Sequence, residues 1–405
     1  MSLFAPLRGL RPPPDRAAEV AELPYDVMNR DEALAMAESR PHSFLHVSRP
    51  DIDLPPGARS DSPEALALAR AAFDRLQRDG LLVRDADPGY HAYRLTRDGQ
   101  AQTGVVGVAD VAAYDAGRIK RHELTRPAKQ ADRAAQIEAV GAQTGPAFLL
   151  HQPSPAIGEV VATAVAAPPA TAIEGPGGVR HELWPIVDAA AVAALTADFD
   201  ALDALYIADG HHRSAAASMV HARLGTPASA GFLAVAFPAD EVTLLPYNRL
   251  VRASDGVTAD ALLAGIAERF VVEPSDGPVN PAAPGRYGLY LDGRWYRLVA
   301  PDELRTAADP VDQLDVAVLQ RHLLEPVLGI ADPRTDPRID FVGGVRPLSE
   351  LVAAVDSGAW TAAIALYPTT VADLIAVADA GGIMPPKSTW FEPKLLDGLV
   401  SHVLD

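Results

Sequence analysis

Residues 203–220, DALYIADGHHRSAAASMV, decide the fold class of this chain. The apolar run Leu-Tyr-Ile-Ala ends at Asp209-Gly210, and the Ala-rich tract after Arg213 is a strong helix former. The stretch therefore predicts a strand, a tight turn and a helix. The turn collects an acid, two imidazoles and a guanidinium, which makes it the first candidate for a functional site.

The segments on either side also alternate between helix and strand signals, which predicts mixed α and β structure. The segment 62–79 predicts a helix because Ser62 is a cap residue, Pro63 suits the first helical position and Gly80 follows the end. The other expected helices are 129–141, 258–270, 312–328, 348–357 and 370–380. The expected strands are 90–96, 103–110, 231–237 and 361–367, with a hairpin at 286–299 and a surface connection around a weak helix within 151–180.

Composition limits the class of protein. The 405 residues contain 53 Asp and Glu against 35 Lys and Arg, a net charge of -18 that disfavours a nucleic-acid partner. There is no cysteine, which excludes disulfides, thiolate zinc sites and cysteine nucleophiles. Hydrophobic residues at 48% indicate a globular protein of two or three domains. No signal peptide or membrane segment is recognisable, so we expect a cytoplasmic protein without a membrane partner.

The turn Asp209-Gly210-His211-His212-Arg213 fits an anionic ligand. A helix N-terminus presents unpaired N–H groups, and an arginine offers a planar fork that matches phosphate or carboxylate. The bland alternative is a capped helix with surface histidines, but capping needs only Asp209. Neighbouring histidines seldom point the same way, so zinc held by His211 and His212 is disfavoured.

Two further segments carry charged groups. His122 and Glu123 form a polar loop with Arg121, Arg126 and Lys129, which would be solvated surface if it stood alone. The tail 381–389, GGIMPPKST, approaches a phosphate loop, but Pro386 replaces a glycine and has no N–H to offer phosphate. It leaves a stiff loop with Lys387, Ser388 and Thr389, followed by Lys394, that indicates anion capture or a solvated C-terminal segment.

Shorter signals complete the set. Pro24-Tyr25-Asp26-Val27 carries an acid, and Leu245-Pro246-Tyr247-Asn248-Arg249 ends in an arginine. No G-x-G-x-x-G fingerprint follows a strand and no G-x-S-x-G elbow occurs, so dinucleotide oxidoreductases and serine hydrolases are disfavoured.

Together these motifs resemble one family over almost the whole chain. The matching stretches are 206–213 (YIADGHHR), 120–125 (KRHELT), 245–249 (LPYNR), 384–389 (MPPKST), and the ends 7–10, 24–27 and 391–395. The sequence resembles a long-uncharacterised bacterial and archaeal family sometimes labelled ParB-like, some members of which are described as kinases of free L-serine. Asn248 departs from the pattern, since many relatives are expected to have histidine there.

The resemblance implies an α+β fold with a ParB/sulfiredoxin-like core around a mixed sheet. It places an N-terminal α/β region at 1–110, the catalytic core at 111–255, and a C-terminal α/β region at 256–405 whose tail returns to the active site. It also implies that Glu123 is the catalytic acid that precedes the Asp-Gly-His-His-Arg motif of the shorter serine kinases. The sulfiredoxin-like fold and these boundaries are expectations.

On this reading the chain moves a phosphoryl group from ATP, or another phosphoryl donor, to the hydroxyl of free L-serine or a similar small molecule. Phosphoryl transfer mainly needs positioning and charge neutralisation. Glu123, with His122 as a further catalytic residue, would activate the hydroxyl, and Asp209 would hold Mg²⁺ or contact the hydroxyl. The residues expected to bind the donor are Gly210, His211, His212, Arg213, Arg249, Lys387, Ser388, Thr389 and Lys394.

Two other functions stay open. One is a ParB-like nucleotide-binding regulatory protein without kinase activity, although no Lys/Arg-rich helix for DNA is evident. The other is a nucleotide phosphohydrolase, which needs no acceptor pocket. The oligomeric state, monomer or homodimer, is open as well.

Overall fold

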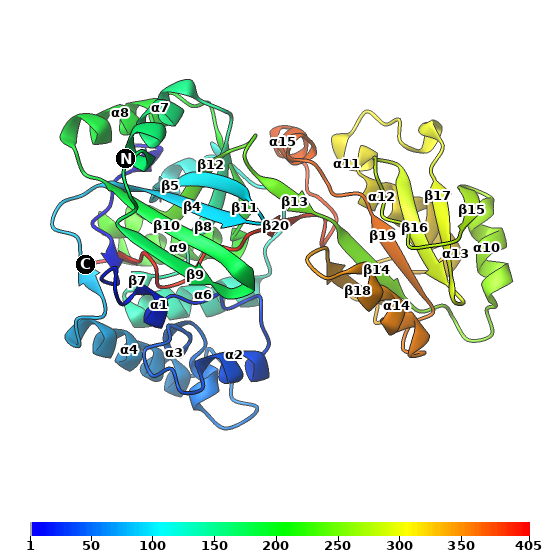
Figure 1. Cartoon of the computed structure of the whole chain (residues 1–405), viewed down its shortest axis with the longest axis horizontal. Coiled ribbons are helices and arrows are strands. Elements are labelled where there is room, and N and C mark those ends of the chain that lie inside the picture. The colour runs from blue at the N-terminus through cyan, green and yellow to red at the C-terminus, as the bar shows by residue number, and fades with distance from the viewer. Residues whose placement is uncertain (1) are drawn as a thin grey trace. The chain divides into compact units, whose positions relative to one another are not determined.

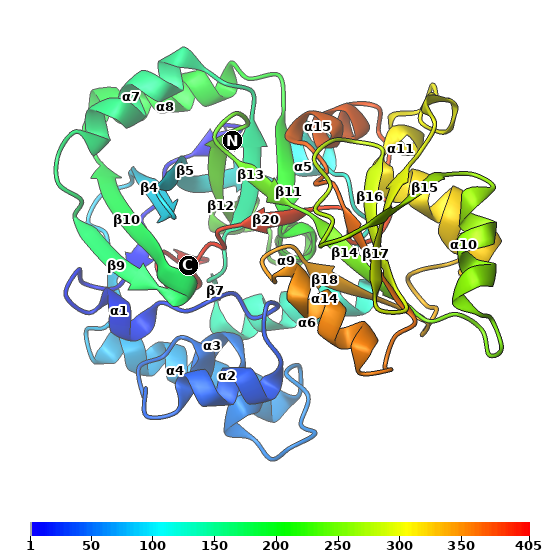
Figure 2. The same ribbon diagram turned by 45° about the vertical axis from the view of Figure 1, so that its right-hand side comes forward.

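The chain divides into two compact units. The computed structural model describes residues 2–405, and the first unit comprises Met1–Val242 with Pro393–Asp405, whereas the second is Thr243–Glu392. Each unit has its own sheet and helices, which Figures 1 and 2 show from two directions. Within the described residues, no helix has both the length and the apolar character needed to cross a membrane.

The first unit is built on a large mixed sheet, in the order β6-β11-β8-β12-β5-β4-β10-β9, with β1 paired to β5. The pairs β11·β6 and β12·β8 are parallel and the rest are antiparallel. The strands are β1 (Phe4–Ala5), β4 (Tyr90–Arg97), β5 (Gln100–Asp110), β6 (Ile119–Lys120), β8 (Ala147–His151), β9 (Thr171–Gly175), β10 (Val179–Ile186), β11 (Leu205–Asp209) and β12 (Gly231–Pro238). Two small ribbons pair β2 (Leu10–Arg11) with β3 (Val83–Arg84) and β7 (Ala142–Gln143) with β21 (His402–Val403).

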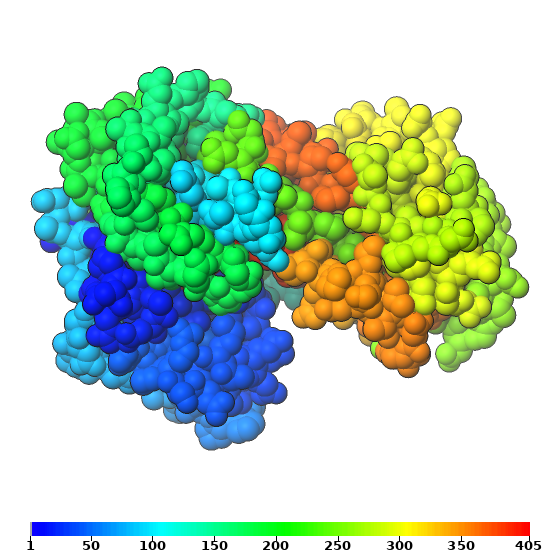
Figure 3. All heavy atoms as spheres, in the orientation of Figure 1, coloured from blue at the N-terminus to red at the C-terminus, as the bar shows by residue number. Residues whose placement is uncertain are grey.

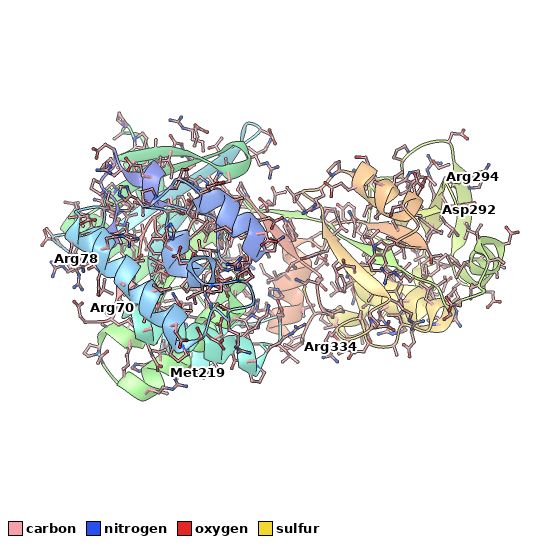
Figure 4. The ribbon with its side chains drawn as sticks, turned by 90° about the horizontal axis from the view of Figure 1, so that it is seen from below. Arg70, Arg78, Met219, Asp292, Arg294 and Arg334 are labelled. Carbon is pink, nitrogen blue, oxygen red and sulfur yellow. The ribbon has the colours of Figure 1, made fainter. Side chains whose placement is uncertain are left out.

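Helices cover both faces of this sheet. Figures 1 and 2 show α7 and α8 side by side on one side and α6 and α9 on the other. The helices are α1 (Ala17–Val20), α2 (Arg30–Ala37), α3 (Leu45–Ser48), α4 (Pro63–Arg78), α5 (Val111–Asp115), α6 (Pro127–Val140), α7 (Pro155–Val165), α8 (Ala189–Asp200) and α9 (His211–Leu224), with short 3₁₀ turns at Pro50–Asp53, Pro176–Gly178 and Ala228–Ala230. Ser62 caps α4 by accepting the N–H of Ala65, and Arg70 and Arg78 project outward from that helix (Figure 4).

The second unit contains an antiparallel sheet in the order β15-β17-β16-β19-β14-β18. Its strands are β14 (Tyr247–Val251), β15 (Val271–Ser275), β16 (Arg286–Leu291), β17 (Arg294–Val299), β18 (Ile339–Gly343) and β19 (Ala362–Leu366), and a separate ribbon pairs β13 (Thr243–Leu245) with β20 (Trp390–Glu392). Its helices are α10 (Ala259–Ala267), α11 (Pro310–Gln313), α12 (Asp315–Leu319), α13 (Glu325–Leu328), α14 (Leu348–Asp356) and α15 (Val371–Asp379), with a 3₁₀ turn at Asp302–Leu304 and a π segment at Gln320–Leu324.

The predicted mixture of helices and strands around a mixed sheet is confirmed, and so are most element positions. The strand, turn and helix of 203–220 are β11, Gly210 and α9, and the hairpin at 286–299 is β16 and β17, turning at Asp292 in the left-handed region. Two predictions need correction. The stretch 151–180 contains α7 and also the strand β9, which within residues 2–405 pairs with β10 alone, at the edge of the sheet, and therefore shows little apolar signal.

The predicted helix 312–328 is interrupted. Leu314 has an extended backbone (ψ 137°), and the helix widens into the π segment just before Pro326, which has no N–H for a regular helical bond. The predicted regions 1–110 and 111–255 share one sheet in the first unit, because β4 and β5 pair with β10 and β12. The three-region division is therefore a different description from the two compact units, and it stays a prediction.

Candidate active site

The turn between β11 and α9 is shaped by Gly210. Its φ of 97° lies in the left-handed region, and a Cβ there would come within 3.1 Å of the Ala147 Cα on β8. Glycine meets both demands, since it has no Cβ and tolerates positive φ. Its N–H donates to Asp209 Oδ1 at 2.9 Å, and α9 starts at the next residue. The acid thus lies at the end of β11, the strand next to the edge strand β6, and beside a helix N-terminus.

Asp209 is held between two cations. Its Oδ2 lies 3.2 Å from Lys394 Nζ and 3.6 Å from Arg213 Nη2, so residue 394, far along the chain, reaches the turn. Burial pushes the pKa of Asp209 upward, but Lys394 and Arg213 outweigh that effect and hold the pKa below its usual range. Asp209 is therefore ionised at neutral pH, as a metal-binding or charge-stabilising carboxylate must be.

His211 joins the turn to the loop of residues 121–126. The backbone N–H of His122 donates to His211 Nε2 at 3.5 Å, and the two rings meet edge to face with centroids 4.5 Å apart. Because Nε2 accepts, the proton of a neutral His211 lies on Nδ1, which faces Glu123 Oε2 at 3.9 Å. The sequence-predicted acid and the predicted turn therefore lie together.

Both histidines are neutral near pH 7. Burial lowers the pKa of His122 to about 4, against the opposing effects of the Ile207 carbonyl and Asp209. Burial, with help from His122, lowers the pKa of His211 well below its ordinary value. They can donate or accept hydrogen bonds at the site, but they bring no positive charge to it.

The contacts of His212 and Arg213 differ from those of His211. His212 Nε2 accepts the backbone N–H of Arg126 at 3.1 Å, which fixes the start of α6 to the start of α9. Arg213 is almost buried, and it donates from Nη1 to the carbonyl of Pro146 while Nη2 faces Asp209. Its Nε is buried without a hydrogen-bond partner. Arg213 thus anchors the turn to the strand β8 and contributes its charge to Asp209.

A small buried cavity of about 40 Å³ lies beside Arg213. Asp397, Arg133 and Tyr25 line it, and the Arg133 guanidinium lies over the Tyr25 ring at 3.9 Å. Burial raises the pKa of Asp397 to about 7, with Asp26 adding to the rise and Arg213 and Arg133 opposing it. Asp397 Oδ1 is buried without a partner.

Sequence reasoning gave no role to Asp397, Arg133 or Asp26. The signal was present in part, because the segment 24–27 was singled out and Asp397 follows Lys394 by three residues. What was missing was the fold, which pairs residue 22 with residue 397 and so brings the segment of Tyr25 and that of Asp397 to the same cavity beside Arg213.

Four predicted binding residues belong to the second unit. Arg249 is buried, donates to the Tyr247 carbonyl and lies over the Phe341 ring at 4.9 Å, and burial lowers its pKa to about 10. Lys387 lies over the Tyr247 ring, with a left-handed φ of 58°. Ser388 Oγ donates to the Pro385 carbonyl at 2.6 Å, and Thr389 follows in the same loop. Their part in the site of the first unit stays a prediction.

Asn248 has a structural explanation. It is buried in β14, and its Oδ1 accepts the backbone N–H of Leu366 at 3.1 Å. No cluster of three or more histidines and carboxylates suited to a metal ion occurs in residues 2–405. The assignment of Asp209 as a Mg²⁺ ligand stays a prediction.

Comparison with known proteins gives a family and several distant structures. A family model described as "Protein of unknown function (DUF1015)" matches residues 4–317. No curated protein matches at a significant level. A conserved hypothetical protein from Pyrococcus furiosus is 14% identical, with a TM-score of 0.35 over 73% of this chain and 93% of that one.

Two further solved structures are as distant. SbnI with a C-terminal truncation, from Staphylococcus aureus, is 12% identical with a TM-score of 0.38, covering 72% of this chain and 85% of that one. A free serine kinase in complex with AMP is 12% identical with a TM-score of 0.35, covering 71% and 86%. TM-scores this low leave the choice of function to the residues of the site.

Proposed function

The chain belongs to the DUF1015 family of proteins of unknown function, and we propose that it is a small-molecule kinase that phosphorylates the hydroxyl of free L-serine. The donor is ATP or a related polyphosphate. The acceptor and the ParB/sulfiredoxin-like core come from the motif resemblance. One observation carries the proposal: Glu123 lies 3.9 Å from His211, and Lys394 lies 3.2 Å from Asp209, at the N-terminus of a fourteen-residue helix.

The helix N-terminus suits the donor phosphates. The first N–H groups of α9 have no partners within the helix and can donate to phosphate oxygens. Lys394 and Arg213 place two positive charges beside the turn, and a bound polyphosphate would share them with Asp209. The neutral His211 can donate its Nδ1 proton to a phosphate oxygen or to Glu123.

The transfer step is a direct displacement. Glu123 accepts the proton of the serine hydroxyl as that oxygen forms a bond to the terminal phosphorus. The bond between this phosphorus and the bridging oxygen breaks, and the shortened nucleotide leaves with the electron pair. The proton passes from Glu123 to solvent, since its side chain is half exposed. His122 packs against His211 and keeps that ring in place.

Asp209 fits the role of the Mg²⁺ ligand on chemical grounds. Lys394 and Arg213 hold its pKa below the usual range against the effect of burial, so the carboxylate is ionised at neutral pH. When bound, Mg²⁺ would neutralise charge on the phosphate oxygens. The cations of Lys394 and Arg213 hold the carboxylate at the turn in the meantime.

The test is ³¹P NMR on the purified chain with Mg²⁺, L-serine and either ATP or ADP as donor. We expect O-phosphoserine to form, and Glu123→Gln to lower the rate by about 10²–10⁴-fold, the usual contribution of a general base. Glu138→Gln is a matched control, because Glu138 pairs with Arg223 on the surface between α6 and α9.

Other outcomes identify the other functions. Consumption of nucleotide at the same rate with and without serine would show a phosphohydrolase. Intact nucleotide that still protects the protein against thermal unfolding would show a nucleotide-binding regulator. Either result contradicts the kinase, and so does a Glu123→Gln variant as fast as the parent chain.

A further inference from the structure

A second, larger cavity lies elsewhere in the first unit. Its volume is about 400 Å³, within the roughly 300–1,000 Å³ of small-molecule sites. Strand residues of β4, β5, β8 and β12, the helix α7 and the turn after β12 line it. Figure 3 shows α7, the tip of the β4–β5 hairpin and that turn gathered on one face. Asp209 pairs with Phe148 at the start of β8, whereas this cavity lies at the other end of that strand, at His151.

His151 lines the cavity, packs edge to face against Phe199 at 5.7 Å, and carries a buried hydrogen-bond acceptor without a partner. The residue is 1% exposed, and its Nδ1 lies 2.8 Å from the carbonyl of Gln152. A carbonyl can only accept, so Nδ1 carries the proton and Nε2 carries a lone pair. Nε2 is buried without a partner. Burial lowers the pKa of His151, opposed by the Gln152 carbonyl and Asp240, which keeps this tautomer neutral. Such an orphaned acceptor is costly unless a ligand or water donates to it.

The charges at the cavity favour a cationic ligand. Asp240 and Glu241 lie at its exposed side, and Glu241 is fixed there because its Oε2 accepts the N–H of Thr103 at 2.9 Å. Arg94 also lines the cavity, but its guanidinium stacks on Trp184 at 5.2 Å and its Nε donates to Thr103 Oγ1. Two carboxylates against one guanidinium leave a net negative charge beside the neutral His151.

The opposite wall is apolar. Ile157, Val161 and Val165 recur every four residues on the face of α7 that lines the cavity, and the strands add Val105 and Ala236. Within α7 only Ile157 is fully buried, so the two valines keep apolar surface that a ligand can cover. The occupant therefore needs an apolar body as well as a hydrogen-bond donor.

We propose that this cavity is a second binding site, for a small primary amine with an aromatic or aliphatic body. The ammonium group would donate to His151 Nε2 and lie beside Asp240 and Glu241, while the body packs against α7. The site is separate from the proposed kinase chemistry, and its occupancy does not require that activity.

The probes are three indoles that share one ring system. Tryptamine carries an ammonium group, tryptophol a neutral hydroxyl and indole-3-acetate a carboxylate. We expect calorimetry on the full chain to give the order tryptamine, tryptophol, indole-3-acetate, with about tenfold or more between the first and last. Equal or tighter binding of indole-3-acetate would overturn the proposal, and so would no binding of any probe.

Two variants of α7 test the location. Ala162 and Thr163 are both exposed, but only Ala162 lines the cavity, so Ala162→Phe fills it without disturbing the core and Thr163→Phe is the matched control. Ala162→Phe should lower the affinity for tryptamine about tenfold or more. Thr163→Phe should leave that affinity within about twofold of the parent chain. A double variant, Asp240→Asn with Glu241→Gln, removes both carboxylates at the exposed side of the cavity. It should reduce the difference in affinity between tryptamine and tryptophol. Tryptamine binding unchanged by Ala162→Phe would place the ligand elsewhere and refute the assignment.

Discussion

Two buried regions beside Arg213 each contain an aspartate, and the pKa values of these two aspartates are shifted in opposite directions. At the turn between β11 and α9, the carboxylate of Asp209 lies within reach of Lys394 and Arg213, and its pKa lies below the usual range. In the small cavity that Tyr25 and Arg133 line, Asp397 has an oxygen without a partner, and burial raises the pKa of Asp397 to about 7. Both carboxyl groups feel the same guanidinium, so proximity to Arg213 alone does not decide their ionisation.

The difference lies in the direct partners. Asp209 has the Lys394 ammonium and the Gly210 N–H at hydrogen-bond distance, and these favour the charged form. Asp397 receives only a backbone hydrogen bond at Tyr25, and the neighbouring Asp26 opposes its ionisation. Asp209 therefore stays charged at neutral pH, which suits phosphate and Mg²⁺ chemistry. Asp397 instead holds a proton up to near-neutral pH.

The largest expected effect follows from removing the charge at the turn. Asp209→Asn should lower serine phosphorylation by about 10³–10⁴-fold, or ~4–5 kcal/mol of transition-state stabilisation, because it removes the negative charge that lies beside Lys394 and Arg213 at the turn. The measurement is initial rate by ³¹P NMR, with the melting transition followed in parallel. Asp203→Asn, in the exposed loop before β11, is the control and should keep the parental rate.

The variant Lys394→Met is a second test of the role of the Asp209 charge. Because Lys394 lowers the pKa of Asp209, removing it should shift the acid limb of the kcat/KM profile to higher pH. An Asp209→Asn variant with parental turnover, or an unmoved acid limb in Lys394→Met, would mean that Asp209 plays no part in the chemistry.

The next largest expected effect concerns Asp397. Its raised pKa makes the folded state less stable as the pH rises, opposite to the effect expected of a carboxyl group whose pKa is lowered. The pKa of Asp397 rises from 3.8 in the unfolded chain to about 7 in the fold, so the folded state keeps a proton that the unfolded state has lost. The free energy of unfolding should therefore fall between about pH 4 and 7, by at most ~4 kcal/mol from this group. Asp397→Asn cannot ionise and should remove that fall.

Urea denaturation at pH 4.5, 6 and 8 measures this directly. The variant should gain stability relative to the parent chain as the pH rises, because only the parent must bury a charge. A constant difference between the two proteins at all three values would show that Asp397 titrates normally, and the contrast with Asp209 would be lost.

Local and long-range features were predicted to different degrees. The strand, turn and helix around Gly210 follow from apolar spacing, glycine and Ala-rich propensity within twenty residues, and the structure has them as expected. Glu123 was assigned from a resemblance, and its position beside His211 depends on the parallel pairing of β6 with β11. No local pattern could show that Asp397 and Tyr25 lie under Arg213, because that needs both chain ends folded against the core.

The interrupted helix at 312–328 and the strand β9 show the same limit on a smaller scale. A π segment before Pro326 and an edge strand with one neighbour are set by tertiary context, and their sequences carry weak periodic signals. Propensity located the helical and extended regions of the chain, but not the places where packing breaks them.

The smallest expected effect tests how tightly Asp397 is enclosed. A Cβ on Gly145 would lie 2.7 Å from Asp397 Oδ1, so Gly145→Ala should destabilise the fold by about 1–3 kcal/mol in urea denaturation at pH 7. Gly158→Ala is the matched control, because nothing lies within 4 Å of its Cβ and it should stabilise α7 by up to about 1 kcal/mol. In an Asp397→Ala background the cost at Gly145 should almost disappear, since the clashing oxygen is gone. If the cost persists there, the cavity is not closed by this carboxyl group, and its raised pKa loses its structural basis.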